Sequence, residues 1–348
     1  MRFSAGKQGA KMGVSFPFKP DSEAEERIEH LKTGELAQPM SRSRMPLVSV
    51  IVPAHNAEAH LPAALASVCA QSYRELEILV VDDGSSDSTA SIVRRMSQTD
   101  TRIRLLSQEN SGVASARNHG IEASEGEFIA PLDADDIWYP DKIKRQMEVM
   151  LGADEELGLV YCGWDIISEK GDPQTRRGNP SLVTGDLSET LIWRNPIGCA
   201  STPLIRRSCF DRIGLYDTSM FEKGCQGCED WDLYLRLAEY YRFEAVPETL
   251  LAYRRGKQSM SASTERMEAS YEVMMNRLRR RRPGIAPRLY RKSRQHYHVY
   301  LAGVSSRSGN KLGAFRHLGI ALASDPGFIV SRPLSMRALG SVLKLLLQ

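Results

Sequence analysis

The sequence predicts an α/β protein whose first half forms a mostly parallel sheet, whose second half is antiparallel and less regular, and whose C-terminal end is helical. Continuous β-branched runs such as VSVIVPA, which begins at Val48, are typical of strands covered on both faces. These runs alternate with helical patterns up to residue 132, and this spacing indicates right-handed crossovers between parallel strands. The basic, helix-forming segments RLRRRRP and RLYRKSR predict the helical end.

The first half is expected to alternate strand and helix in chain order. A helix should follow the first strand, because Leu61, Leu65 and Val68 recur on one helical face. Pro62 fits the first turn of this helix, where its missing N–H costs nothing. The pattern then predicts strands at 76–81, 103–108 and 128–132, and helices at 86–96 and 113–123.

The second half is predicted to begin with a helix at 143–151, followed by short elements that include the runs LVYCGWDII and FEAVPETLLAY. Residues 1–45 have little periodicity apart from a charged, helix-compatible patch at 22–32, and they are expected to be a flexible leader. The chain is thus divided into this leader, a main domain at 46–264 and a basic α-helical region at 265–348 with two or three amphipathic helices.

Composition and charge restrict the possible functions. The chain of 348 residues is 42% hydrophobic and carries a formal net charge of +3, which does not indicate a general polyanion binder, and nucleic acid is not an expected partner. No apolar run reaches the ~20 residues that cross a bilayer. The absence of a positive-then-apolar leader predicts a cytoplasmic protein with reduced cysteines. Cys225 and Cys228 have the spacing of half a metal site or a redox pair, but no second pair accompanies them.

Polar side chains follow three predicted strands at the points where these strands end. The three segments are Pro53-Ala54-His55-Asn56-Ala57-Glu58, Asp82-Asp83-Gly84-Ser85 and Asp133-Ala134-Asp135-Asp136. Ligands of open parallel sheets bind beyond the carboxyl ends of the strands. Crowded carboxylates repel one another, so a divalent cation is expected among them, and hard oxygen ligands favour Mg²⁺ or Mn²⁺. The alternatives are an Asx turn at the second segment and a helix cap at the third.

These segments resemble the inverting glycosyltransferases of family 2, which use nucleotide-diphosphate sugars on the GT-A fold. The resemblance covers about Pro46 to Ser261, in the order VSVIVPAHNAEAHLPAALASVCAQSY, LEILVVDDGSSDST, RLLSQENSGVASARNHGI, GEFIAPLDADDIWYPDKI and CEDWDLYLRL. It implies a GT-A catalytic domain with a Rossmann-like, mostly parallel sheet, a nucleotide-sugar half at 46–140 and an antiparallel acceptor half at 141–264. The implied enzyme is an inverting, metal-dependent hexosyltransferase that uses a UDP-sugar and serves cell-surface polysaccharide or glycoconjugate synthesis. Its acceptor would be a saccharide or be lipid-linked.

The resemblance also implies roles for individual residues. Asp133 and Asp135 match the metal-binding Asp-x-Asp, with Asp135 as the firmer ligand, and Asp136 is expected to cap the next helix. Asp83 would meet a uracil-type imide, because a carboxylate accepts from a ring N–H. Arg117 would bind phosphate or lie on a helix surface. The donor-binding residues are Pro53, Ala54, His55, Asn56, Glu58, Asp82, Asp83, Arg117, Asn118, Asp133 and Ala134, although Asn118 could be only a packing amide.

The pair Glu229-Asp230 matches the acidic pair that opens the acceptor-side helix of the family. Inversion by a single displacement requires one base that removes the proton from the acceptor hydroxyl, and Asp230 is the expected base. A carboxylate at a helix start is also a common cap. Trp231 would lie under a sugar ring or pack in the core.

Several alternatives stay open. Gly256 occupies the place where many relatives have a histidine near the metal, so metal binding from this loop is not expected, and Arg254, Arg255 or Lys257 could contact phosphate instead. The basic helices could dock on the anionic inner face of a membrane or pack as an annex on the catalytic body. A sugar-1-phosphate nucleotidyltransferase is one competing class, but it would carry a Gly-rich, basic loop after its first strand. The segment PAHNAEAH at this place is neither Gly-rich nor basic. A non-catalytic nucleotide-sugar-binding module is the other competing class.

Overall fold

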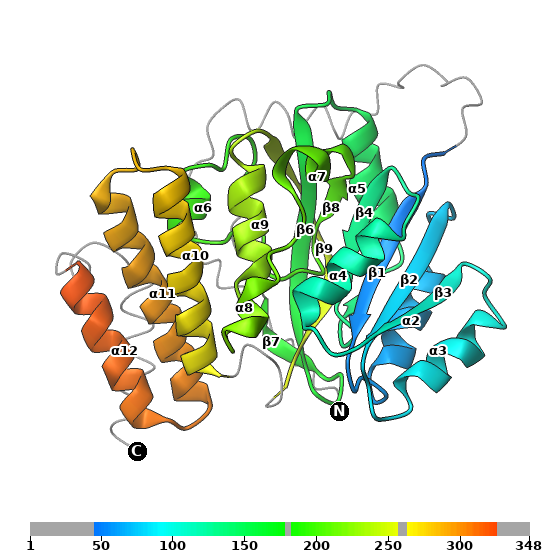
Figure 1. The fold of residues 1–348 in the computed structure, drawn as a ribbon, viewed down its shortest axis with the longest axis horizontal. Helices are drawn as coiled ribbons and strands as arrows, with labels where there is room; N and C mark the ends of the chain where they lie inside the picture. Colours follow the sequence, from blue (N-terminus) through cyan, green and yellow to red (C-terminus); the bar gives the residue numbers. More distant parts are fainter. Residues whose placement is uncertain (1–44, 178–181, 257–262, 326–348) are drawn as a thin grey trace, which may run out of the picture. The chain divides into compact units, whose positions relative to one another are not determined.

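The computed structural model describes residues 45–177, 182–256 and 263–325. In these residues the chain from Pro46 onward contains a nine-stranded sheet in the order β3-β2-β1-β4-β8-β6-β9-β5, with β7 paired to β6 (Figure 1). The strands are β1 Val48–Ala54, β2 Leu76–Asp83, β3 Ile103–Gln108, β4 Phe128–Pro131, β5 Ile137–Trp138, β6 Leu157–Ser168, β7 Pro173–Arg177, β8 Leu204–Arg206 and β9 Arg242–Arg255. The parallel pairing of β1 with β2 and β4, and of β2 with β3, confirms the predicted crossovers. The patch at 22–32 lies outside the described residues.

The helices of the first half agree with the predicted ones, with one shifted start. α3 begins three residues later than expected, because the carboxylate of Asp87 accepts the backbone N–H of Thr89 and holds the preceding residues in a turn. The helices of the described residues are α2 Leu61–Cys69, α3 Thr89–Ser97, α4 Val113–Glu122, α5 Lys142–Leu151, α6 Thr190–Trp193, α7 Ser208–Ile213, α8 Ser219–Glu222, α9 Glu229–Leu237, α10 Thr264–Arg281, α11 Pro287–Arg307 and α12 Lys311–Ser324.

The sheet is covered on both faces, which explains why its central strands are apolar along their whole length. Neighbouring residues of a strand point to opposite faces. Ile51 of β1 therefore joins the core beneath α4 and α9, whereas Val50 and Val52 join the core beneath α2, α3 and α5. All seven residues of β1 are buried. The layers bring the polar residues that follow the strands to one edge of the sheet.

The second half is mixed rather than wholly antiparallel. β8 runs antiparallel to β4 and β6, as predicted, but the long strands β6 and β9 run parallel to each other. Their register jumps between the pairs Cys162–Val246 and Trp164–Leu251. Pro247 lies in this irregular stretch, because proline has no N–H to donate to the ladder. The resulting bulge sets which residues of β9 reach the edge of the sheet.

Of the three C-terminal helices, α10 lies beside α9, and α11 and α12 follow farther from the sheet (Figure 1). α10 contributes Met267, Tyr271 and Met274 to the same core as α9, and α11 contributes Tyr297. Tyr271 and Tyr297 stack with ring centroids 4.2 Å apart, and each ring also lies close to the indole of Trp231. The described part of the extension therefore packs as an annex on the main body. No helix in the described segments combines the length and apolarity that a membrane span requires.

Candidate active site

A cavity of about 950 Å³ lies at the carboxyl ends of β1, β2 and β4. The register explains the convergence, because Ala54 of β1 pairs with Asp82 of β2 and Ile51 pairs with Pro131 of β4. Its other side is formed by the start of α9 and by residues of β6, β9 and α11. The predicted site residues that line this cavity are Pro53, Ala54, His55, Asn56, Asp83, Arg117, Asp133, Ala134, Asp135, Glu229 and Asp230.

The loops after β1 and β2 are locked together. Asn56 adopts a left-handed backbone conformation with φ of 49°, which asparagine tolerates better than most residues. Its backbone N–H donates to Ser85 Oγ at 2.9 Å, and its side-chain Oδ1 accepts from the backbone N–H of Ser86 at 2.9 Å. His55 Nδ1 lies 2.8 Å from the carbonyl oxygen of Asp83. These contacts hold the wall of the cavity next to β1 and β2 in one arrangement.

Asp83 is fixed by three hydrogen bonds from the segment before α4. Its Oδ1 accepts from Gln108 Nε2 at 2.8 Å and from the backbone N–H of Ser111 at 2.9 Å. Its Oδ2 accepts from the backbone N–H of Gly112 at 2.9 Å and retains capacity for a second donor. Gly112 has φ of 87°, and a Cβ there would lie 2.6 Å from the ring of Phe221. Glycine at this position therefore permits the close approach that fixes Asp83.

Three predicted donor-binding residues do not line the cavity, and each has a structural partner instead. Glu58 Oε2 accepts from the backbone N–H of Ser88 at 3.0 Å. Asp82 Oδ1 accepts from the backbone N–H of Ser85, three residues later, at 3.1 Å and so closes the turn after β2. Both amide atoms of Asn118 bind the backbone of Tyr216, at 2.8 and 2.9 Å. These residues support the walls of the cavity, and Asn118 is a packing amide.

Arg117 is buried and does not lie on a helix surface. Its Nη2 donates to Asp133 Oδ1 at 2.6 Å, and its guanidinium lies 5.3 Å from the centre of the Tyr216 ring. Arg117 also lowers the pKa of both Glu229 and Asp230, although burial, the largest cause, raises the pKa of each. One buried cation thus lies between the carboxylate at the end of β4 and the acidic pair of α9.

The carboxyl groups at the end of β4 are crowded. Burial raises the pKa of Asp135 to about 6, and the neighbouring Asp133 acts in the same direction. A divalent cation would relieve this crowding, and carboxylate oxygens are the ligands that Mg²⁺ and Mn²⁺ prefer. Asp133 keeps one oxygen that Arg117 does not bind. The donor set therefore fits the predicted metal.

Asp136 points inward but does not cap the next helix. It is fully buried, and its Oδ2 accepts from Ser201 Oγ at 2.6 Å while its Oδ1 accepts from the backbone N–H of Arg254 at 2.9 Å. α5 begins six residues after Asp136, with Asp141 at its N-cap position, so Asp136 is too far away to cap it. The guanidinium of Arg254 donates to three backbone carbonyls, including that of Asp135 at 2.8 Å. Arg254 is thus a structural arginine, and Lys257 lies outside the described residues.

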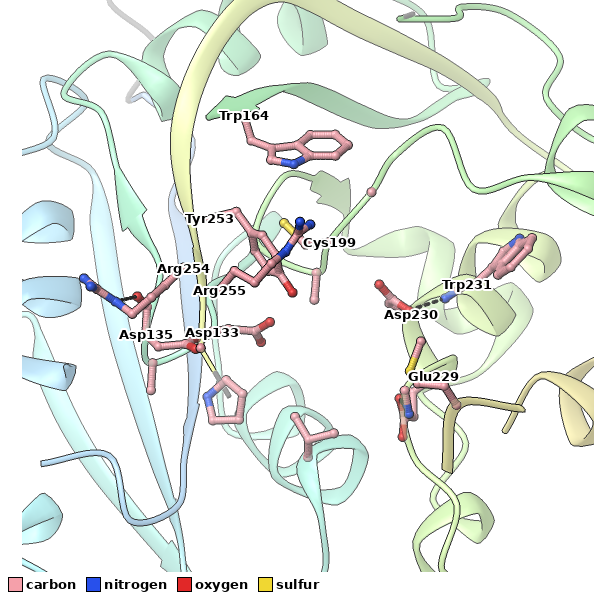
Figure 2. A pocket seen from close by; sticks show the side chains of 18 of the residues that line it. Asp133, Asp135, Trp164, Cys199, Glu229, Asp230, Trp231, Tyr253, Arg254 and Arg255 are labelled. Carbon is pink, nitrogen blue, oxygen red and sulfur yellow. Dashed lines mark hydrogen bonds between the residues drawn. The ribbon is translucent and has the colours of Figure 1, made fainter. Parts of the chain in front are cut away.

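Asp230 lies at the start of α9 and faces the cavity (Figure 2). Its Oδ1 accepts from the backbone N–H of Trp231 at 2.7 Å, while the N-cap position belongs to Cys228. Burial raises the pKa of Asp230 to about 7. Glu229 is turned back, with its Oε2 accepting from the backbone N–H of Gly227 at 2.8 Å. A carboxylate with a pKa near 7 suits a general base.

Trp231 packs in the core, where its Nε1 donates a hydrogen bond to the carbonyl of Leu191.

Most of the residues that line the cavity were not predicted as site residues. Trp164 of β6 and Tyr253 and Arg255 of β9 face it from one side (Figure 2). α11 contributes His296, Tyr300 and Arg307, which recur at helical spacing and lie on one face. That spacing was visible in the sequence, but nothing in the sequence indicates which face of α11 meets the main body. The loop after α6 contributes Arg194, Asn195, Pro196, Gly198, Cys199 and Ala200.

Two other groups of chemically active side chains lie elsewhere. Cys225 and Cys228 are buried free thiols, and Cys228 Sγ lies 3.4 Å from the Tyr297 hydroxyl. Glu268, His298 and His317 come together between the C-terminal helices, with the two Nδ1 atoms 3.1 Å apart. Arg316 already binds both oxygens of Glu268, at 2.7 and 2.9 Å. This cluster is separate from the cavity and does not contain the predicted metal ligands.

Known proteins resemble the chain over this region. The family model described as Glycosyl transferase family 2 matches residues 49–214. An uncharacterized glycosyltransferase of Haemophilus influenzae is 32% identical over 226 residues, which cover 62% of this chain and 68% of that protein. An uncharacterized glycosyltransferase of Rickettsia typhi is 36% identical over 203 residues, or 56% of this chain, and the match spans 61% of that relative's length.

A solved structure shares the fold over most of the chain. The mannosyltransferase PcManGT from Pyrobaculum calidifontis, solved in complex with GDP-Man and Mn²⁺, has a TM-score of 0.55 and 21% sequence identity. The match covers 93% of this chain and 88% of that chain. At this identity the likeness shows the fold, which is the one that the sequence predicted.

Proposed function

The chain belongs to glycosyl transferase family 2, and we propose that it is an inverting hexosyltransferase that uses a nucleotide-diphosphate sugar. The observation that carries this proposal is the arrangement of Asp135 and Asp230 around one cavity, with Arg117 between their two sides. Two carboxylates with raised pKa values, one at a strand end and one at the start of the acceptor-side helix, suit metal binding and proton removal respectively.

The nucleotide is proposed to lie against the loops after β1 and β2. Asp83 can accept from a ring N–H with its remaining capacity, which suits the imide of uracil, so UDP is the expected carrier. His55 and Asn56 complete this wall. Because Asp83 is held by backbone N–H groups, it needs no rearrangement to receive the base.

The diphosphate is proposed to lie beyond the end of β4. Asp135 and the free oxygen of Asp133 would hold Mn²⁺ or Mg²⁺, which would offset the charge that builds on the departing diphosphate. Arg117 keeps Asp133 in place through its Nη2. Arg255 lines the same cavity and can contact phosphate.

The proposed chemistry at α9 is a single displacement. Asp230 removes the proton from an acceptor hydroxyl while that oxygen attacks the anomeric carbon and the bond from this carbon to the diphosphate breaks. The base and the leaving group lie on opposite sides of the sugar, so the configuration inverts. General-base help of this kind typically contributes ~10²–10⁴-fold to the rate.

The acceptor is proposed to be a saccharide or a lipid-linked saccharide in cell-surface polysaccharide or glycoconjugate synthesis. The exposed residues Arg279, Arg280 and Arg281 at the end of α10 give the extension a basic surface. Such a surface could hold the enzyme at the cytoplasmic face of a membrane, because basic residues near anionic lipid contribute ~1 kcal/mol each. The proposed catalytic unit is the domain at 46–264 together with α11, whose residues line the cavity.

Calorimetric titration with UDP, GDP, dTDP and CDP, each with and without Mn²⁺, tests this function. The expected result is tight binding of UDP that requires Mn²⁺, followed by transfer of a sugar from the matching donor. Binding without turnover of any donor sugar would favour the non-catalytic module. If no nucleotide binds, the acidic edge is structural and the proposal fails.

A further inference from the structure

We propose that the acceptor of this enzyme carries a negative charge, a carboxylate or a phosphate, which Arg194 and Arg307 bind on the α11 side of the cavity. The inference rests on the proposed function and names the class of substrate that the same site accepts. It follows from how charge and aromatic surface are distributed around the cavity.

The two halves of the cavity wall differ in charge. The nucleotide side carries the carboxylates Asp83, Asp133 and Asp135. Two buried guanidinium groups lie there, and that of Arg117 is paired with Asp133 while that of Arg254 is held by three backbone carbonyls. The opposite side carries three guanidinium groups from three separate segments, which are Arg194, Arg255 and Arg307. The carboxyl groups on that side are Glu229 and Asp230, whose pKa burial raises, and the exposed Glu169 directly after β6.

The cationic side chains are held in place by aromatic rings. The guanidinium of Arg194 lies 5.0 Å from the Trp193 ring centre, and Lys292 Nζ lies 3.7 Å from the same ring. The ring of His296 is 5.6 Å from that of Trp193. α6 and α11 are thereby joined at the cavity rim. Such cation–π contacts orient a guanidinium through its flat face, whereas a planar anion meets the N–H donors along its edge.

Tyr300 lines the same cavity as Arg255 and Arg307. Desolvation raises the pKa of Tyr300, and the two guanidinium groups act in the opposite direction. The guanidinium of Arg255 is also 5.9 Å from the Tyr253 ring. A ligand that enters from the α11 side therefore passes aromatic faces and positive charge before it reaches Asp230.

The surface for the sugar rings themselves is provided by Trp164. Gly198 has φ of 94°, and a Cβ at this position would lie 2.2 Å from the Trp164 indole. The backbone of the loop after α6 therefore lies flat against the indole and fixes it as a wall of the cavity. Saccharides stack on such rings, because the aliphatic faces of the sugar are apolar. Guanidinium groups beside a fixed indole suit a sugar that carries a carboxylate or phosphate better than a neutral sugar.

Calorimetry on the full chain with saturating UDP and Mn²⁺ tests the inference, because the nucleotide then fills the donor side. The probes are p-nitrophenyl β-D-glucuronide, glucose 1-phosphate and the neutral p-nitrophenyl β-D-glucoside. We expect one of the anionic probes to bind at least about tenfold more tightly than the glucoside, which corresponds to one charge-assisted hydrogen bond. The glucuronide and the phosphate distinguish the two sources of charge.

The variants Arg194→Gln and Arg307→Gln should each weaken the anionic probe about fivefold or more and leave the affinity for UDP unchanged. Arg307→Lys should retain part of the preference for the anionic probe over the glucoside, because lysine keeps the positive charge but lacks the planar guanidinium. Arg291→Gln, on an exposed position of α11 outside the cavity, is the matched control and should change nothing. Thermal unfolding verifies that each variant folds.

Three outcomes would overturn the inference. The first is equal or undetectable binding of all three probes to the UDP-bound enzyme. The second is a preference for the anionic probe that survives in a variant that carries both Arg194→Gln and Arg307→Gln. The third is a loss of UDP affinity in the Arg194→Gln or the Arg307→Gln variant. The last result would place these arginines at the donor diphosphate. Failure of the proposed function is a separate result, because it appears in the first titration as absent nucleotide binding.

Discussion

Arg117 Nη2 lies 2.6 Å from Asp133 Oδ1, and the two side chains differ in exposure, at 5% for the arginine and 29% for the aspartate. The cation is the buried partner, so the pair places a permanent positive charge inside the protein. Arg117 also lowers the pKa of Asp230, which is half-buried at the start of α9. Arg117 therefore connects the proposed metal side and the proposed base electrostatically, although it contacts only the former.

Replacing Arg117 with glutamine should raise the pKa of Asp230 above its present value of about 7, because a cation that favours the ionised form is lost. The base works when deprotonated, so the acidic limb of kcat/KM for sugar transfer should move to higher pH by about one unit. Arg117→Lys keeps the charge and should leave the limb near its original position. An unchanged limb in the glutamine variant would show that Asp230 does not feel this cation.

Asp135→Asn should abolish the Mn²⁺-dependent part of UDP binding and leave the fold intact, because it removes one hard anionic ligand. In the unchanged protein the gain from Mn²⁺ should fall as the pH drops below about 6, where the Asp135 carboxyl takes up a proton. Calorimetry with and without Mn²⁺ at about pH 7.5 and about pH 5.5, on either side of that pKa, measures both effects. Asp141→Asn, at an exposed aspartate that accepts from Ser72 Oγ, serves as the control. Equal UDP affinity of the Asp135→Asn variant and the control in Mn²⁺ would remove Asp135 from the metal site.

Asp230→Asn should retain donor binding and lose transfer by ~10²–10⁴-fold, the usual contribution of a general base. The amide is nearly isosteric and can still accept from the Trp231 N–H, so α9 should begin at the same residue. Parallel measurement of UDP affinity and of kcat separates the two effects. Turnover within about tenfold of the original enzyme would move the base to another residue.

The buried pair His298–His317 should make the annex sensitive to acid. Burial lowers the pKa of His298 to about 4, well below the value of an unfolded histidine. The unfolded chain therefore binds more protons than the folded one. The free energy of unfolding should decrease as the pH falls below about 6.5, and it should decrease further towards pH 4. Glu268 opposes the shift, while His317, Arg294 and Arg316 add to it.

Urea unfolding at about pH 7 and about pH 5 measures this contribution, which should be on the order of 1–2 kcal/mol. His298→Gln keeps a polar side chain beside His317 but cannot be protonated, so its stability should decrease less between the two pH values. The same decrease in both proteins would show that other groups cause the acid sensitivity.

The first half of the fold and the nucleotide side of the cavity could be predicted because their signals are local. A strand that is buried on both faces is a continuous apolar run, and the residue after it must lie at the edge of the sheet. Asp83, Asp133 and Asp135 were found in this way. The sequence does not distinguish Asp82 and Asn118 from these residues, because tertiary contacts determine the hydrogen-bond partner of each side chain.

The opposite side of the cavity, where we propose that the acceptor binds, could not be predicted in the same way. Arg194, Trp164 and Tyr300 come from three distant segments, and only packing brings them to one cavity. The parallel pairing of β6 with β9 was also missed, since the direction of a strand leaves no mark in its own sequence. A helix such as α11 has several polar positions, and the sequence does not indicate which of them face a cavity in the main domain.

The bulge at Pro247 determines which arginine the substrate can meet. From Cys162 to Trp164 strand β6 advances by two residues, while β9 advances by five, from Val246 to Leu251. Successive side chains point to opposite faces, so the parity of the extra residues decides whether a given position faces inward or outward. Both Arg254 and Arg255 line the cavity, but the guanidinium of Arg254 is held by three backbone carbonyls. Loss of one residue here would exchange the faces of β9 on which the two arginines lie. A single-residue deletion far from the reacting atoms could therefore exchange a scaffold residue for a substrate contact, a route by which relatives could acquire a different specificity without any substitution in the site.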